Sequence, residues 1–163
     1  YKVLGTSWMD HEYSSNQLNN ELAGWDWFSL KLDDQTELML YQLRLKAGGV
    51  DSFSSGTLVT ADGVSRHLKR NEFIVRPLTE WKSKRSGIIY PSGWELELPS
   101  FRIKVKLSPD LLDQELYGLR SISASYWEGS VSIEGNVGGD LVKGKGYVEL
   151  VGYGKPLLQD LPD

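Results

Sequence analysis

The segment WDWFSLKLDDQTELMLYQLRL, residues 25–45, carries the clearest signature of the fold. Its two halves, residues 25–32 and 37–45, are rich in aromatic and branched apolar side chains with polar residues at intervals, a composition typical of β-strands. The four polar residues between them, 33–36, are typical of a tight turn. The segment therefore predicts a β-hairpin.

Short segments of the same kind recur along the rest of the chain. The most regular is FRIKVKL, residues 101–107, in which four apolar residues share one face of a strand and three basic residues share the other. Asp62-Gly63 is a strong hairpin-turn dipeptide, because a type I′ turn needs positive φ at both central positions. Further strands are expected at residues 55–61, 66–76, 93–98, 126–134 and 146–153, with glycines 135, 138 and 139 marking the last turn.

About eight to ten strands at regular spacing, with no long amphipathic helix, predict an all-β fold: an antiparallel barrel or sandwich. A barrel removes exposed strand edges and, at about eight strands, leaves room for one small ligand. The chain of 163 residues fits one domain. We expect the barrel to span residues 1–155 and residues 156–163 to form a C-terminal tail.

Composition narrows the classes of function. The formal net charge is −4 with basic residues scattered among acidic ones, which argues against a nucleic-acid partner. No apolar run approaches the roughly 18 residues of a transmembrane segment. The chain has no cysteine and two histidines, and it lacks a glycine-rich phosphate loop, so neither a metal site nor a cofactor is expected. Six Trp and eight Tyr suit the walls of a site for an apolar small molecule.

Polar residues interrupt three of the expected strands. Asp26 falls on the apolar face of its strand, Gln42 and Arg44 do so on the next strand, and Glu149 lies within the apolar run YVELV. A buried charge must be paired or neutralised. Arg44 has three candidate partners: Asp10, Asp26 and Glu149. Such residues form either a structural network inside the barrel or part of a ligand pocket, and Glu149 has the further option of facing solvent from an edge strand.

The segment SWMDHEYSSNQL, residues 7–18, concentrates ionisable groups beside aromatic ones. Alternation places Trp8 and Asp10 on one face and His11 on the other. A carboxyl held against an indole has a raised pKa and can donate a proton near neutral pH. We therefore predict Asp10 and His11 as catalytic residues. The expected ligand-binding residues are Trp8, Trp25, Trp27, Tyr41, Gln42, Arg44, Trp127 and Glu149.

Several segments together resemble a known family. SWMDHEYSSNQL, GWDWFSLKLDDQTELMLYQLR, SGTLVTADG, YPSGWELELP, YWEGSVSIEG and GYVELVGYG occur in this order and cover about residues 3–154. They resemble the carotenoid 1,2-hydratase (hydroxyneurosporene synthase)-like family, particularly its branch of predicted secreted hydrolases. The resemblance implies a lipocalin-like β-barrel that forms the C-terminal half of a two-barrel protein, with a preceding N-terminal barrel as partner. It also favours a periplasmic or secreted location.

The resemblance further implies a chemistry. Hydratases of that family add water across a carbon–carbon double bond of a terpenoid without a cofactor, through protonation by a carboxylic acid. Trp8 and Asp10 match the family motif, whereas His11 stands where some relatives have arginine. A hydrolase would need a nucleophile or metal set, which the sequence does not present.

Three functional hypotheses follow. The first is a cofactor-free hydratase-like or hydrolase-like enzyme acting on an apolar, terpenoid or polyketide-like molecule. The second is a lipocalin-like domain that binds an apolar ligand without converting it. The third is a structural half of a two-barrel protein.

Overall fold

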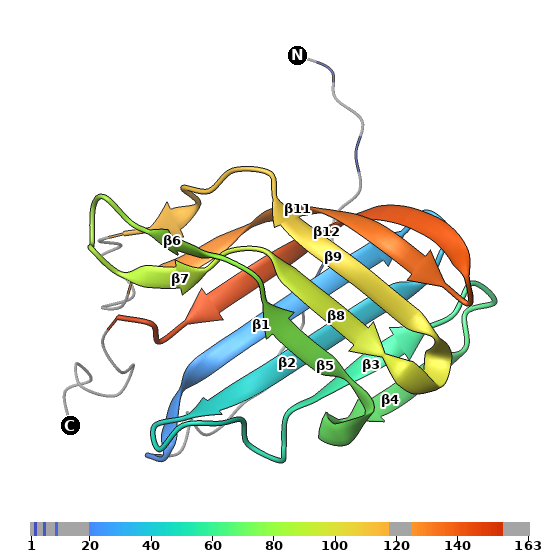
Figure 1. Ribbon diagram of the computed structural model, residues 1–163, viewed down its shortest axis with the longest axis horizontal. Coiled ribbons are helices and arrows are strands. Elements are labelled where there is room, and N and C mark those ends of the chain that lie inside the picture. The colour runs from blue at the N-terminus through green and yellow to red at the C-terminus, as the bar shows by residue number, and fades with distance from the viewer. Residues whose placement is uncertain (1, 3–4, 6–8, 10–19, 118–124, 155–163) are drawn as a thin grey trace.

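The computed structural model describes residues 20–117 and 125–154, together with residues 2, 5 and 9 (Figure 1). No helix in these ranges is both long and apolar enough to cross a membrane. The described residues form twelve strands and two short 3-10 helices: β1 Leu22–Leu32, β2 Glu37–Leu45, β3 Ser55–Val59, β4 Ser65–Lys69, η1 Arg70–Glu72, β5 Ile74–Pro77, β6 Glu80–Lys82, β7 Ile89–Pro91, β8 Trp94–Leu98, η2 Pro99–Phe101, β9 Ile103–Pro109, β10 Glu115–Leu116, β11 Tyr126–Val137 and β12 Asp140–Val151.

Nine strands form one antiparallel sheet in the order β4-β3-β2-β1-β12-β11-β9-β8-β5. The sheet curls over so that β5, β8 and β9 lie across β1, β2 and β3 (Figure 1). Its two edges, β4 and β5, are consecutive in the chain and joined through η1, and no ladder links them within the described ranges. The prediction of an antiparallel all-β barrel is confirmed, with the barrel left open at this one seam.

Two short pairings lie outside this path. β10 pairs with β11, and β6 pairs with β7 as a separate two-stranded ribbon. Residues 87–91, which lie outside the strands expected from the sequence, therefore contain a strand, because Ile89–Pro91 aligns with Glu80–Lys82. Sequence alternation cannot identify a strand of three residues.

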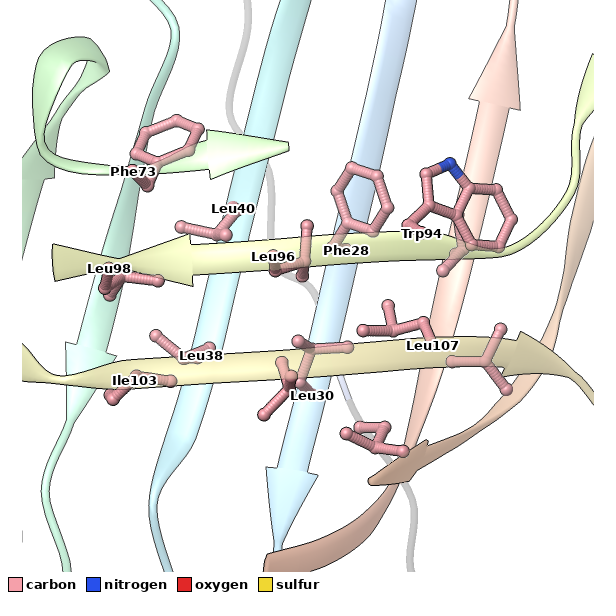
Figure 2. Close-up of a cluster of buried hydrophobic side chains, with 14 of the residues drawn as sticks. Phe28, Leu30, Leu38, Leu40, Phe73, Trp94, Leu96, Leu98, Ile103 and Leu107 are labelled. Atoms are coloured by element: carbon pink, nitrogen blue, oxygen red, sulfur yellow. The ribbon is translucent and has the colours of Figure 1, made fainter. Parts of the chain in front are cut away.

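The barrel interior is filled by side chains. β8 and β9 cross β1 and β2, and the apolar residues of the two layers meet between them (Figure 2). Phe28 meets Trp94 edge to face, with ring centroids 5.9 Å apart, and Trp94 lies 6.0 Å from Trp127. All three side chains are at most 1% exposed. The centre of the barrel is therefore a packed core.

The hairpin of β11 and β12 is longer than the sequence indicates. Only Gly138 and Gly139 form the turn, both with positive φ, and the strands continue on either side. Gly135, expected in the turn, lies within β11, where a Cβ atom would come 2.2 Å from the carbonyl oxygen of Lys104 on β9. Glycine is needed there because the neighbouring strand approaches closely.

Candidate functional site

The alternation of β-strands divides the predicted site residues between two faces of one sheet. Asp26, Gln42 and Trp127 are buried on the inner face, and Arg44 reaches the same side. Four others, Trp25, Trp27, Tyr41 and Glu149, occupy the intervening outward positions and are partly exposed. Trp8, Asp10 and His11 lie outside the described residues, as does the tail 156–163.

On the inner face, Arg44 pairs with Asp26. The guanidinium Nε donates to the Asp26 carboxylate at 2.9 Å, and Arg44 also donates to the backbone carbonyl of Val151. The same guanidinium lies 3.8 Å from the ring centroid of Tyr153, whose hydroxyl donates to both oxygens of Asp26 at 2.9 and 3.1 Å. Among the two candidate acids in the described part of the chain, Arg44 contacts Asp26, while Glu149 faces outward. This arrangement ties β1, β2 and β12 together.

The ionisation of this inner network follows from its burial. Burial raises the pKa of Asp26, while the charge of Arg44 and the hydrogen bonds from Tyr153 and Arg44 oppose that rise. Burial, followed by the charge of Asp26, raises the pKa of Tyr153, so this hydroxyl stays protonated and acts as a donor. Gln42 lies directly across from Asp26 in the β1–β2 register and is also buried.

A second buried carboxylate lies beside this network. Glu115 accepts hydrogen bonds from Ser83 at 2.5 Å, Ser86 at 2.5 Å and Tyr90 at 3.0 Å, and the rings of Tyr90 and Tyr153 are 5.7 Å apart. Burial raises the pKa of Tyr90, and its hydrogen bond to Glu115 adds to the rise. Glu115 connects β10 to β7 and the preceding turn. Sequence reasoning missed it because residues 109–119 show no alternation.

Trp127 belongs to the core. Its side chain is 1% exposed, it packs against Trp94, and its indole N–H donates to the carbonyl of Leu112 at 2.8 Å. The ring of Trp127 is therefore used in packing the interior of the barrel.

On the outer face, aromatic and acidic residues form a continuous row across four strands. Tyr41 of β2 is level with Trp27 of β1, Trp27 is level with Glu149 of β12, and Glu149 is level with Glu128 of β11. The indole N–H of Trp25 donates to Glu149 at 3.3 Å. Further tyrosines flank the row. We call this surface the aromatic–acid face; it consists of Trp25, Trp27, Tyr41, Tyr126, Glu128, Tyr147 and Glu149.

The electrostatics of the aromatic–acid face are unusual because two carboxylates are direct cross-strand neighbours. Like charges in this position repel one another. Burial raises the pKa of Glu128, although a hydrogen bond from Tyr126 opposes the rise. Burial and the charges of Glu128 and Glu149 raise the pKa values of Tyr126 and Tyr147. Binding of a proton, or of another positive charge, to the aromatic–acid face therefore relieves the repulsion between its two acids.

Sequence reasoning found four members of this face and missed Glu128, Tyr126 and Tyr147. The segment YWEGS does show the needed alternation, with Trp127 on one side and Tyr126 and Glu128 on the other. What the sequence lacks is the register that sets Glu128 opposite Glu149.

The remaining outer surface has a different character. On β5, β8 and β9, Arg76 and Lys104 form ion pairs with Glu95 and Glu97 at 2.6–3.2 Å. A groove of about 490 Å³ lies nearby and contains none of the predicted site residues. It is lined by Asp33, Lys104, Lys106, Glu134, Gly135, Asn136, Leu141, Val142 and Lys143. Within the described ranges, no group of three or more His, Cys, Asp or Glu side chains is arranged to hold a metal ion.

The fold and this surface define a class: an antiparallel β-barrel with a packed centre and an aromatic, acidic patch on its outer side. The AttH-like family matches residues 1–153, and the chain belongs to this family. Among curated proteins, the chain is similar to kievitone hydratase of Fusarium solani subsp. phaseoli, with 30% identity over 153 residues. The match covers 89% of this chain and 40% of that protein.

Two solved structures are also similar. One is a protein assigned as AttH from Nitrosomonas europaea, with 33% identity and a TM-score of 0.76 over 87% of this chain and 42% of that one. The other is kievitone hydratase from Nectria haematococca, with 25% identity and a TM-score of 0.65 over 80% and 39% of the two chains. The chain thus spans about two fifths of the length of these relatives.

Proposed function

We propose that this chain is part of a hydratase-like enzyme that adds water to a carbon–carbon double bond of an apolar, terpenoid or polyketide-like molecule without a cofactor. The observation that carries the proposal is the carboxyl pair of Glu128 and Glu149 among aromatic side chains on one sheet face. The similarity to kievitone hydratase, a hydratase by name, supports the reaction class.

The chemistry needs a carboxylic acid, a surface for positive charge and a basic group. The acid transfers its proton to one carbon of the double bond; the π electrons form the new C–H bond and leave a positive charge on the other carbon. Water then bonds to that carbon and loses a proton to a basic group, either a carboxylate or an imidazole. We assign the acid to Asp10 and the proton acceptor to Glu149 or His11, with Glu128 as a second carboxyl group of the aromatic–acid face. Aromatic rings stabilise the charge between these steps.

The inner network has a supporting part in this proposal. Asp26 lies between Trp25 and Trp27 in the chain, and Arg44 contacts the carbonyl of Val151, two residues from Glu149. These contacts of Arg44 therefore link β1, β2 and β12, three of the four strands that carry the aromatic–acid face. We assign Asp26, Arg44 and Gln42 to positioning, and Trp127 to the core behind them.

The proposal concerns the longer protein as well. A preceding barrel of the same kind would cover the aromatic–acid face and exclude bulk water, leaving only the water molecule that adds to the substrate. The length of the relatives is consistent with an additional domain. A periplasmic or secreted location remains part of this proposal.

The test is incubation with an apolar metabolite extract in heavy-oxygen water, followed by mass spectrometry of products and of compounds retained by the protein. Wild type is compared with Asp10→Asn and Glu128→Gln. The matched control is Glu134→Gln, since Glu134 is exposed on the same strand, outside the aromatic–acid face. We expect labelled product with wild type and the control, at least about 100-fold less with Asp10→Asn, and a smaller loss with Glu128→Gln.

One result would contradict the assignment of the acid, and another would contradict the enzyme proposal as a whole. Full activity in Asp10→Asn would remove the acid assignment. An unchanged compound retained by every variant, with no labelled product, would instead favour a binding domain, a function that the partly exposed aromatic residues also suit.

A further inference from the structure

We infer that the aromatic–acid face binds a positive charge carried on an apolar skeleton and discriminates against anions. This inference rests on the proposed function in one respect: the same face is taken as the substrate site. It goes further by naming the charge that the site recognises. Three features of the described residues lead to it.

The first feature is the concentration of aromatic rings. Trp27 and Tyr41 are direct cross-strand neighbours, and Trp25 lies two residues from Trp27 on the same side of β1. The faces of such rings carry partial negative charge and attract cations, with tryptophan the strongest. The barrel shows this preference elsewhere, because the Arg44 guanidinium lies over Tyr153 at 3.8 Å.

The second feature is the position of the two acids within this surface. Glu128 and Glu149 are level with one another on adjacent strands, which places their Cβ atoms about 5 Å apart. A positive group beside them reduces their mutual repulsion and gains an attraction to both. An anion meets two like charges. Charge complementarity therefore favours the cation over an uncharged analogue and the uncharged analogue over the anion.

The third feature is the distance that separates Trp27 and Glu149 from the lysines further along β1 and β12. Lys31 of β1 lies four residues from Trp27, and Lys145 of β12 lies four residues from Glu149, about 13 Å along each strand. Both are ion-paired, Lys31 with Glu37 at 3.0 Å and Lys145 with Asp110 at 3.1 Å. At physiological ionic strength, charges at this separation are largely screened. These two lysines therefore do not neutralise the acids of the aromatic–acid face, although Lys145 lies two residues from Tyr147 at its edge.

Two sources of positive charge present similar electrostatics to this face. One is a stable ammonium group on a ligand. The other is the charge that develops on carbon during the proposed addition of water, for which an amine of similar shape is a stable mimic. The same rings and carboxylates recognise both, and the experiment separates them.

The experiment uses three ligands with one ring system: 1-naphthylmethylamine, 1-naphthylmethanol and 1-naphthoate. Each is titrated into the protein at pH 7 and followed by the indole N–H signals in nitrogen-15 NMR, with Trp25 and Trp27 assigned by substitution. We expect the amine to bind at least about tenfold more tightly than the alcohol and the carboxylate to bind most weakly. The signals of Trp25 and Trp27 should move, and that of the buried Trp127 should not.

Variants connect the selectivity to the two acids. In Glu128→Gln/Glu149→Gln the amine's advantage should fall below about threefold, whereas Glu134→Gln should retain it. Raising the salt concentration to 0.5 M provides a measurement on the unaltered protein: it should weaken the amine and leave the alcohol unchanged. Equal binding of all three ligands, no binding by any, or a preference that survives the double substitution would overturn the inference.

Binding is measured without turnover, so the outcomes for the two proposals are separable. Charge selectivity without labelled product supports the inference, assigns the face to a stable cationic ligand and contradicts the hydratase. Competitive inhibition of labelling by the amine supports the inference and assigns the recognised charge to the reaction. Labelled product without charge selectivity would leave the hydratase intact and overturn the inference alone.

Discussion

The two faces of β1 and β12 carry acids in opposite circumstances. On the inner face, the charge of Asp26 is matched by Arg44, and the hydroxyl of Tyr153 donates to the same carboxylate. On the outer face, Glu149 accepts the Trp25 indole N–H and lies level with another carboxylate, Glu128. Acids on opposite faces of the same sheet thus have different surroundings. The inner acid is paired within the barrel, and we propose that the outer pair makes a surface that attracts positive charge.

The largest expected effect comes from breaking the inner pair. Asp26→Ala leaves the Arg44 guanidinium partly buried without its carboxylate and removes the acceptor of Tyr153. We expect the free energy of unfolding to fall by about 3–5 kcal/mol, measured by urea denaturation. Asp26→Leu/Arg44→Met, which removes both charges, should recover much of this loss.

The matched change on the outer face is Glu149→Gln, which keeps an acceptor for Trp25 and reduces repulsion with Glu128. Its unfolding free energy should stay within about 1 kcal/mol of wild type. If this variant is destabilised as strongly as Asp26→Ala, the distinction between a structural inner acid and a functional outer acid is wrong.

A smaller effect should distinguish the tryptophans. Trp127→Phe loses a hydrogen bond to Leu112 and part of a packed ring, so we expect a loss of about 1–3 kcal/mol in unfolding free energy. Trp27→Phe should cost less than about 1 kcal/mol, yet weaken binding of 1-naphthylmethylamine at least threefold. Equal stability losses would show that both rings serve the core.

The smallest effect concerns pH. Because the pKa of Glu128 is raised in the folded state, the folded protein holds this proton to higher pH than the unfolded chain. The carboxyl's contribution to stability is therefore fully present below its ordinary value of 4.5 and is lost as pH rises through the folded value. Relative to Glu128→Gln, wild type should lose stability across this window, as denaturation series at several pH values would show. A wild type that gains stability there would contradict the sign of the shift.

The sequence was sufficient for the fold because its alternation is strong. The hairpin of β1 and β2 and the inward face of β9 follow from period-two patterns, and the structure confirms both. Arg102 shows a limit: it adopts a left-handed φ of 54° after η2, so the inward alternation begins at Ile103 rather than Phe101. A single residue with a left-handed backbone produces no repeating pattern of apolar and polar residues, so the sequence does not reveal it.

The site was harder to predict because it depends on register. The two-residue alternation of side chains along a β-strand correctly placed Asp26 and Gln42 with the core residues of their strands. It could not select the partner of Arg44, since Asp10, Asp26 and Glu149 were all possible by charge alone. It also could not reveal that Glu128 faces Glu149, because that contact depends on how β11 aligns with β12. Asp10 and His11 remain predictions.

The open seam between β4 and β5 has a consequence for how the barrel moves. A fully closed barrel must break a ladder of hydrogen bonds to expand, whereas this one can widen by parting its two edges while η1 keeps them tethered. The edges resist joining another molecule, since β4 carries Arg66, His67 and Lys69 on exposed positions and β5 ends at Pro77. Amide hydrogens of these two strands should therefore exchange with solvent faster than those of β1 and β12. Faster exchange there would show that the barrel opens locally at the seam.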